Sequence, residues 1–182
     1  MLVAKQVADL ITFGRGLLAF FLAGLGLLGG GREALPLVAW LMLVDWCGDL
    51  VDGPIARRSS VSYRTWIGDH DLQIDMLVST GLLVYLLGAG YVTWWVGVLY
   101  LLGWALFFLK AGVQPAPGML FQAPTYFWFI WTAVRDARGM GILIILLIIT
   151  LVIITWPKFP QVVVPGFLEG MRKATRPLQR RK

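Results

Sequence analysis

The feature that most constrains this chain is a series of long apolar runs, each of a length suited to a membrane-spanning helix. A bilayer core of about 30 Å requires roughly 20 helical residues. Six segments meet this requirement, at residues 10–28, 35–56, 69–87, 92–109, 119–134 and 140–156. Stretches rich in glycine or proline separate several of them, as at Gly29–Gly31 and Pro115–Gly118. We therefore predict an all-α fold, a polytopic membrane bundle of six transmembrane helices.

The composition supports lipid as the solvent for much of the surface. The chain is 58% hydrophobic and only 14% charged, whereas a soluble domain carries roughly 25% charged residues. The net charge of +6 could indicate nucleic acid, but the basic residues lie between or after the apolar runs. That placement favours anionic lipid headgroups, so we expect membrane lipids and no nucleic acid as partners. The lone Cys47 excludes an internal disulfide.

The distribution of Lys and Arg predicts the orientation. With the N-terminus inside, thirteen basic residues fall on the cytoplasmic side and three fall outside. The three outer residues are Arg32, Arg135 and Arg138. By the positive-inside rule both termini are cytoplasmic. We divide the chain into a transmembrane domain, residues 1–160, and a basic juxtamembrane tail, residues 161–182, that anchors at the lipid interface.

Carboxylates are concentrated in one part of the chain. Six of the ten acidic residues lie between positions 45 and 75, and charged groups near a membrane span are costly unless partnered. At about 100° per residue, Asp45, Asp49 and Asp52 share one helix face, and Asp71 and Asp75 share another. The second and third segments are joined by a short polar loop, so an antiparallel pair brings Asp49, Asp52, Asp71 and Asp75 together at the cytoplasmic interface.

These four carboxylates suit a hard divalent cation. Like charges this close disfavour one another's ionised form, so the group either shares protons or holds cations. Oxygen ligands without a His–Cys set favour Mg²⁺ or Mn²⁺ over zinc. A hydrated divalent site that is open to phosphate oxygens suits displacement at phosphorus. The small residues Gly48, Gly53 and Ala56 leave one side of the second helix thin, either for a nucleotide or for a neighbouring helix.

The order of these residues resembles a known signature. The run Asp49-Leu-Val-Asp52-Gly53-Pro-Ile-Ala56-Arg57, followed by Asp71-Leu-Gln-Ile-Asp75, is similar to D-x-x-D-G-x-x-A-R, a spacer and G-x-x-x-D-x-x-x-D. That is the signature of the CDP-alcohol phosphatidyltransferase family, whose length and six spans also agree with this chain.

A second element and a departure accompany the signature. The run Asp9-Leu-Ile-Thr12-Phe-Gly-Arg15 resembles the N-x-x-T-x-x-R element of many members, with Asp9 in place of Asn. The glycine of the second half should fall at Ile67, but the nearest glycine is Gly68. The displaced glycine predicts a distorted start to the third helix.

The resemblance implies a role for each matching position. Asp49, Asp52, Asp71 and Asp75 would ligate one or two Mg²⁺ or Mn²⁺ ions. Asp75 would also be the general base for the acceptor hydroxyl, and Asp71 is grouped with it as catalytic. The nucleotide-binding residues would be Gly53, Ala56 and Arg57, which line the CDP pocket, and Thr12 and Arg15, which close it from the first helix.

The implied activity belongs to phospholipid biosynthesis. A hydroxyl of a small alcohol acceptor, such as glycerol phosphate or inositol phosphate, would attack the lipid-bearing phosphorus of CDP-diacylglycerol and release CMP. The family commonly forms homodimers. We expect a multi-pass protein of a bacterial or archaeal cytoplasmic membrane, with its active site at the cytoplasmic face.

Several alternatives stay open. The donor could be a CDP-linked headgroup transferred to diacylglycerol, as in aminoalcohol phosphotransferases. Intramembrane prenyltransferases also bind magnesium diphosphate through aspartate pairs, but they lack the Gly-x-x-Ala-Arg continuation. A divalent-cation transporter would need carboxylates along its path, and the cluster here lies at one end of two helices. Asp45 is either a support for the metal ligands or a buried polar link. Arg58, Arg64 and Lys110 either bind an acceptor phosphate or serve topology and headgroups.

Overall fold

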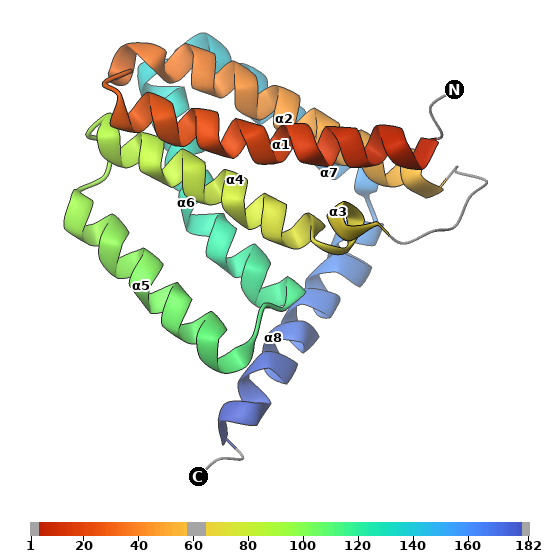
Figure 1. Cartoon of the computed structure of the whole chain (residues 1–182). Helices are drawn as coiled ribbons and strands as arrows, with labels where there is room; N and C mark the ends of the chain where they lie inside the picture. The colour runs from red at the N-terminus through yellow and green to blue at the C-terminus, as the bar shows by residue number, and fades with distance from the viewer. Residues whose placement is uncertain (1–3, 58–64, 180–182) are drawn as a thin grey trace. The chain divides into compact units, whose positions relative to one another are not determined.

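A computed structural model describes residues 4–57 and 65–179, and every element in those ranges is helical. The chain divides into two compact units, Met1–Tyr91 and Val92–Lys182. The transmembrane domain predicted for residues 1–160 covers the first unit and most of the second. The predicted tail, residues 161–182, is the end of the second unit. Figure 1 traces the elements of each unit in chain order.

The first unit is built around its first helix. Helix α1 (Ala4–Leu27) packs against both α2 (Leu35–Arg57) and α4 (Asp71–Gly88), as Figure 1 shows. A 3₁₀ turn, η1 (Arg32–Ala34), precedes α2, and a short helix, α3 (Trp66–Asp69), precedes α4. The predicted direct pairing of the second and third segments is therefore replaced by an arrangement in which α1 contacts both.

Small residues set the contact between α1 and α4. A Cβ on Gly81 would meet the Ala19 carbonyl oxygen and lie 2.9 Å from its carbonyl carbon. A Cβ on Gly88 would lie 2.8 Å from the Gly26 Cα. The backbones therefore touch at two places seven residues apart on each helix, as is common where membrane helices pack through small residues. Because both positions advance together along the chain, α1 and α4 run parallel.

Polar groups make contacts at the end of the first unit where α1 turns into α2 and α4 ends. Arg32 donates from Nε to the Ala89 carbonyl at 3.4 Å, and its guanidinium lies 5.0 Å from the centre of the Tyr91 ring. The Tyr85 hydroxyl donates to the Gly31 carbonyl at 3.1 Å. These contacts satisfy carbonyls at the end of α4 and in the α1–α2 turn, which lack helical partners.

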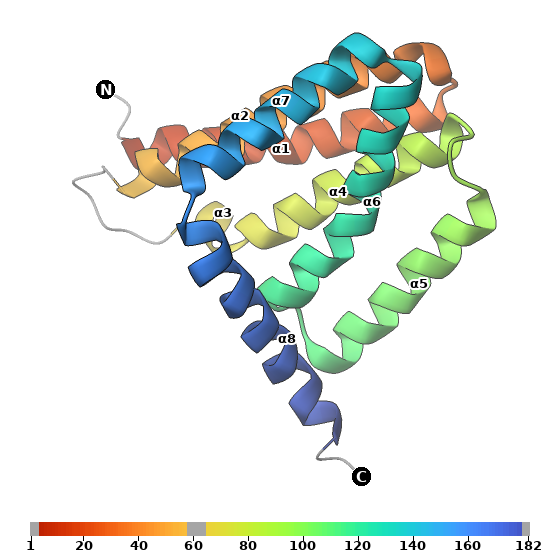
Figure 2. The same cartoon turned by 180° about the vertical axis from the view of Figure 1, so that it is seen from behind.

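The second unit contains α5 (Trp94–Ala111), α6 (Pro115–Asp136), α7 (Arg138–Thr155), the π-helical turn η2 (Phe159–Val163) and α8 (Val164–Gln179). Figure 2 shows that the beginning of α6 lies beside α8 and that the end of α6 lies beside α7. A Cβ on Gly170 of α8 would lie 2.8 Å from the Ala116 Cβ. A Cβ on Gly141 of α7 would lie 2.5 Å from the Val134 Cα. On α5, Tyr100 stacks on Phe121 of α6, with ring centres 5.7 Å apart.

Four helices among the described residues are long and apolar enough to cross a membrane, namely α1 (from Gln6), α4, α5 and α7. Their length and composition are consistent with the predicted membrane character of the chain. Helices α2 and α6, with 23 and 22 residues, are also long enough. They are more polar, since α2 carries Asp45 and Asp49 and α6 buries Gln122 and Thr132. The six predicted segments all exist as helices, and the crossing of all six stays a prediction.

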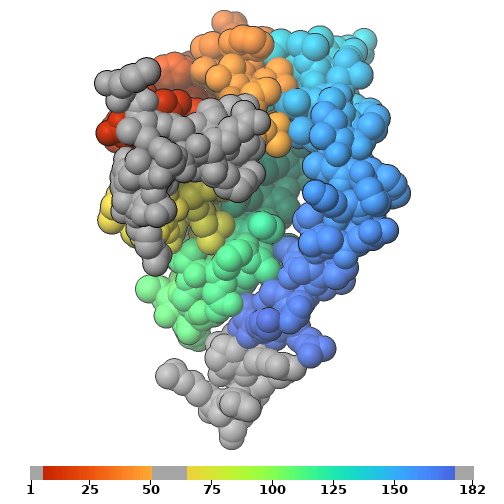
Figure 3. Space-filling model, turned by 90° about the vertical axis from the view of Figure 1, so that its right-hand side faces the viewer, coloured from red at the N-terminus to blue at the C-terminus, as the bar shows by residue number. Residues whose placement is uncertain are grey.

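Most of the predicted basic tail forms the helix α8, which ends at Gln179. Figure 3 shows α7 and α8 in succession along the side of the second unit that faces the viewer. On α8, Ala174 is fully buried and Leu168 is exposed. Lys173 pairs with Glu169 one turn earlier at 2.8 Å. A helix with separate apolar and basic faces suits the predicted interfacial placement.

Candidate functional site

The polar residues of the first unit converge because of the directions of its helices. On α1 and α2, Arg15 meets Asp45 and Asp49, and a Cβ on Gly48 would lie 3.3 Å from Ile11. Ile11 comes before Arg15 on α1, but its partner Gly48 comes after Asp45 on α2. These two helices therefore run antiparallel. The end of α2 and the beginnings of α1 and α4 therefore lie together, within a single unit.

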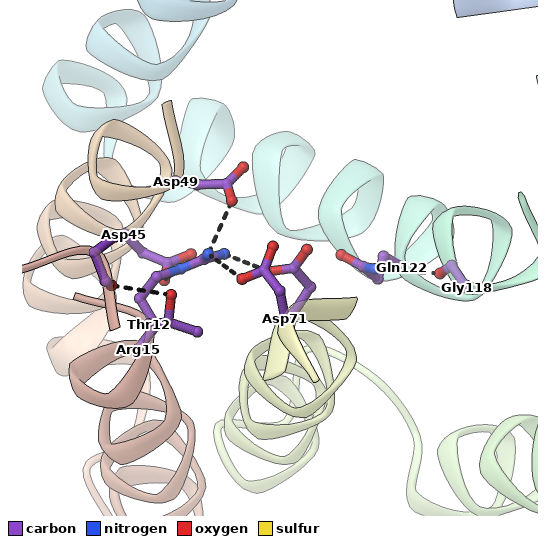
Figure 4. Close-up of polar contacts among 9 residues, drawn as sticks. Thr12, Arg15, Asp45, Asp49, Asp71, Gly118 and Gln122 are labelled. Atoms are coloured by element: carbon purple, nitrogen blue, oxygen red, sulfur yellow. Dashed lines mark hydrogen bonds and ion pairs between the residues drawn. The ribbon is translucent and has the colours of Figure 1, made fainter. Parts of the chain in front are cut away.

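Arg15 is the centre of this convergence, as Figure 4 shows. Its Nε donates to Asp45 Oδ1 at 3.0 Å, and its Nη1 donates to Asp49 Oδ1 at 2.8 Å. Its Nη2 donates to Asp75 Oδ1 at 2.5 Å, and Asp71 Oδ1 lies 3.7 Å from Nη1. The Arg15 side chain is only 6% exposed. One planar guanidinium thus connects α1, α2 and α4 through charge-assisted hydrogen bonds.

Three of the four motif aspartates form a candidate metal centre. Each of Asp49, Asp71 and Asp75 offers one carboxylate oxygen, and the three oxygens lie within 4.8 Å of one another. Oxygens bound to one Mg²⁺ at about 2.1 Å lie roughly 3–4 Å apart, so small side-chain rotations would complete the site. The side chains of Asp49 and Asp71 are each 46% exposed. A ligand can therefore reach them from outside the bundle.

The charge and chemistry of the donor set fit a divalent ion. The carboxylates of Asp45, Asp49, Asp71 and Asp75 face the single guanidinium of Arg15. When ionised, these five side chains carry a formal charge of −3, which added cations would reduce. Carboxylate oxygens with room for water or phosphate oxygens are the coordination that Mg²⁺ prefers.

The remaining motif positions of the second helix fall at its end. Asp52, Gly53, Ala56 and Arg57 belong to the last turns of α2, and their side chains lie outside the described residues. Arg58 and Arg64 lie outside them as well. The predicted metal role of Asp52 and the predicted CDP contacts of Gly53, Ala56 and Arg57 stay predictions.

The two residues predicted on the first helix have different surroundings. Thr12 is 5% exposed and donates its hydroxyl to the Ala8 carbonyl at 3.2 Å, within its own helix. Arg15 instead binds carboxylates of two other helices. The sequence element placed Arg15 near a nucleotide, but it did not indicate that Arg15 would bridge the aspartates.

The role of Asp45 in the site was not decided by the sequence. Its side chain is fully buried and its Oδ1 accepts the Arg15 Nε hydrogen. The signal was present in the spacing, since Asp45 lies one helical turn before Asp49 on the same face. What the spacing left open was the partner, which comes from α1.

The displaced glycine coincides with a break before α4. Helix α3 ends at Asp69, and α4 begins at Asp71, with His70 between them. This confirms the predicted distortion, and it places Asp71 in the first turn of α4, where a negative charge is favoured by the helix dipole. The His70 Nδ1 lies 2.8 Å from the Trp66 carbonyl, and the two rings stack.

A further contact ties α3 to the first helix. Thr65 caps α3 by accepting from the Gly68 amide at 3.2 Å, and its hydroxyl donates to Asp9 Oδ1 at 3.0 Å. Asp9 occupies the position at which the resembling element has Asn, and a carboxylate accepts this hydrogen bond well. The contact helps to hold the start of α4 beside α1.

Comparisons of the chain with models of protein families, with curated proteins and with solved structures gave no match.

Proposed function

We propose that this protein is a divalent-metal-dependent CDP-alcohol phosphatidyltransferase. The observation that supports the proposal most is the approach of Asp49, Asp71 and Asp75 to within 4.8 Å. They come from two different helices, α2 and α4, at the spacing of the signature. Their partial exposure suits a site that receives a lipid-borne diphosphate and an alcohol from the interface.

The reaction follows from what the carboxylates can do. A bound Mg²⁺ or Mn²⁺ would neutralise the diphosphate and polarise the phosphorus centre. Asp75 accepts the Arg15 Nη2 hydrogen through Oδ1. A metal held by Asp75 would take this oxygen in place of Nη2, and we assign the other oxygen, Oδ2, to take the acceptor proton. The acceptor oxygen then forms a bond to the lipid-bearing phosphorus, the bond from that phosphorus to the CMP oxygen breaks, and CMP leaves with the electron pair. Asp75 releases its proton before the next cycle.

The first test is CMP release by purified protein in detergent. CDP-diacylglycerol is supplied with Mg²⁺ or Mn²⁺ and a panel of acceptors that includes glycerol phosphate, inositol phosphate and serine. We expect CMP only with metal and with one acceptor, and EDTA should abolish the signal. A parallel arm with a CDP-linked aminoalcohol and diacylglycerol tests the alternative donor.

Failure in both arms, with folded protein that binds Mn²⁺, would contradict the proposal. The transporter alternative then gains support if protein in sealed vesicles moves Mn²⁺ across the bilayer. Transport should show as quenching of a metal-sensitive dye trapped inside the vesicles. An enzyme of the proposed class should bind the ion without moving it.

The orientation is tested by labelling single cysteines. In a Cys47→Ser background, the exposed residues Glu33 and Asp69 lie at opposite ends of the first unit and are replaced by Cys one at a time. If the site faces the cytoplasm, a membrane-impermeant maleimide should label the cysteine at 33 in intact cells. The cysteine at 69 should react only after permeabilisation, and the reverse pattern would place the site outside.

A further inference from the structure

Arg15 binds the same carboxylates that the proposed metal would need. Its Nη1 and Nη2 donate to Asp49 and Asp75, which are two of the three candidate metal ligands. Nη1 also lies 3.7 Å from Asp71 Oδ1. The guanidinium is therefore a cation already present at the mouth of the carboxylate cluster.

A divalent ion and this guanidinium compete. A carboxylate oxygen that accepts a short hydrogen bond from Arg directs one lone pair and part of its charge to that donor. A metal ion that binds the same group at about 2.1 Å needs that charge, and it is repelled by a second cation a few ångströms away. Entry of the metal must therefore weaken or displace the Nη contacts.

The Nε contact differs from the other two. It is made to Asp45, whose side chain is fully buried and which is not among the three candidate metal ligands. Asp45 lies one turn further into the bundle than Asp49. A metal bound by the other three carboxylates leaves the Nε hydrogen bond in place.

We propose that Arg15 is a resident cation that holds the carboxylate cluster together until a divalent metal replaces its Nη groups, and that Asp45 retains Arg15 through Nε during this exchange. Asp45 is then a positioning residue that acts through Arg15. This inference rests on the proposed function for the identity of the metal ligands. After the exchange, Nη1 and Nη2 lie beside the metal and can donate to a phosphate oxygen of the donor lipid.

The test is the affinity for Mn²⁺ of purified protein without substrate, measured by electron paramagnetic resonance. In Arg15→Gln the competing charge is gone, so we expect the Kd for Mn²⁺ to fall by about tenfold or more. Arg15→Lys keeps one charge but lacks the planar fork, so it should lower the Kd less. Asp49→Asn is the reference for loss of a ligand and should raise the Kd.

Asp45 is tested in two backgrounds. With Arg15 present, Asp45→Asn removes a carboxylate that the metal does not need. Arg15 then pairs more strongly with the three candidate metal ligands, so the Kd for Mn²⁺ should rise severalfold. In the Arg15→Gln background the same substitution should have little effect. An equal rise in both backgrounds would mean that Asp45 acts on the metal directly, which would overturn its positioning role.

The outcomes separate this inference from the proposed function. Unchanged or weaker Mn²⁺ binding by both Arg15 variants, beside a weakened Asp49→Asn, overturns the exchange whatever the activity. Tightened binding by Arg15→Gln in a protein that releases no CMP supports the exchange and contradicts the proposed function. Absence of Mn²⁺ binding by the unaltered chain overturns both. If Arg15→Gln does not fold, Arg15→Lys and the isosteric Asp45→Asn still test the inference.

Discussion

Asp75→Asn is expected to reduce metal-dependent CMP release by about 10³-fold, because it removes both a metal ligand and the proposed general base. Asparagine keeps an oxygen that can accept the Arg15 Nη2 hydrogen, which Asp75 accepts through Oδ1 at 2.5 Å. The link between α1 and α4 can therefore still form before metal binds, so the variant should fold and the loss should appear in turnover. The measurement is the initial rate of CMP release under saturating metal and acceptor.

Glu33→Gln is the matched control for this substitution. Glu33 is an exposed carboxylate at the other end of the same unit, so its neutralisation should leave the rate unchanged. An Asp75→Asn protein that retains more than about a tenth of the rate would show that Asp75 is neither the base nor an essential ligand. Circular dichroism of both variants checks that the helical fold is intact.

Gly81→Ala is expected to destabilise the first unit by about 3 kcal/mol, at the upper end of the usual cost of overpacking. The added Cβ would meet the Ala19 carbonyl oxygen and lie 2.9 Å from its carbonyl carbon. The atoms in the way belong to the backbones of two helices, so no side-chain rotation relieves the contact. The measurement is the free energy of unfolding of the protein in detergent micelles.

Gly24→Ala provides the control within α1. A Cβ there meets nothing within 4 Å, so stability should be unchanged or slightly improved by the higher helix propensity of alanine. Gly81→Ala should also weaken Mn²⁺ binding, because separation of α1 from α4 moves Asp71 and Asp75 away from Asp49. Equal stability of the two variants would contradict the close packing of α1 and α4.

The helices of this protein were largely predictable from the sequence. The bilayer thickness sets the length of an apolar run, and glycine or proline marks most of its ends, so the six segments were found with small errors. The clearest error concerns the stretch before Met119, where Pro115 was taken as part of a break. In the structure Pro115 is the first residue of α6, a position where proline is tolerated because the amide there needs no helical partner.

The pairing of the helices was less predictable. The aspartate spacing indicated that the end of α2 and the start of α4 meet, and Asp49, Asp71 and Asp75 do approach one another. It did not show that α1 contacts both helices. That arrangement depends on the register of Ala19 and Gly26 against Gly81 and Gly88, and small residues are too common in membrane helices to reveal their partners.

The sequence by itself determined that this chain forms long apolar helices suited to a membrane, with carboxylates concentrated on two of them, because hydropathy, helical periodicity and residue spacing are local properties of the chain. Only the tertiary structure decided which cation these carboxylates face. Arg15 lies 30 residues before Asp45 and 60 before Asp75, and its hydrogen bonds to both require the parallel packing of α1 on α4 and the antiparallel packing of α1 on α2. Long-range contacts of this kind follow from how helix surfaces fit together, which no local pattern records.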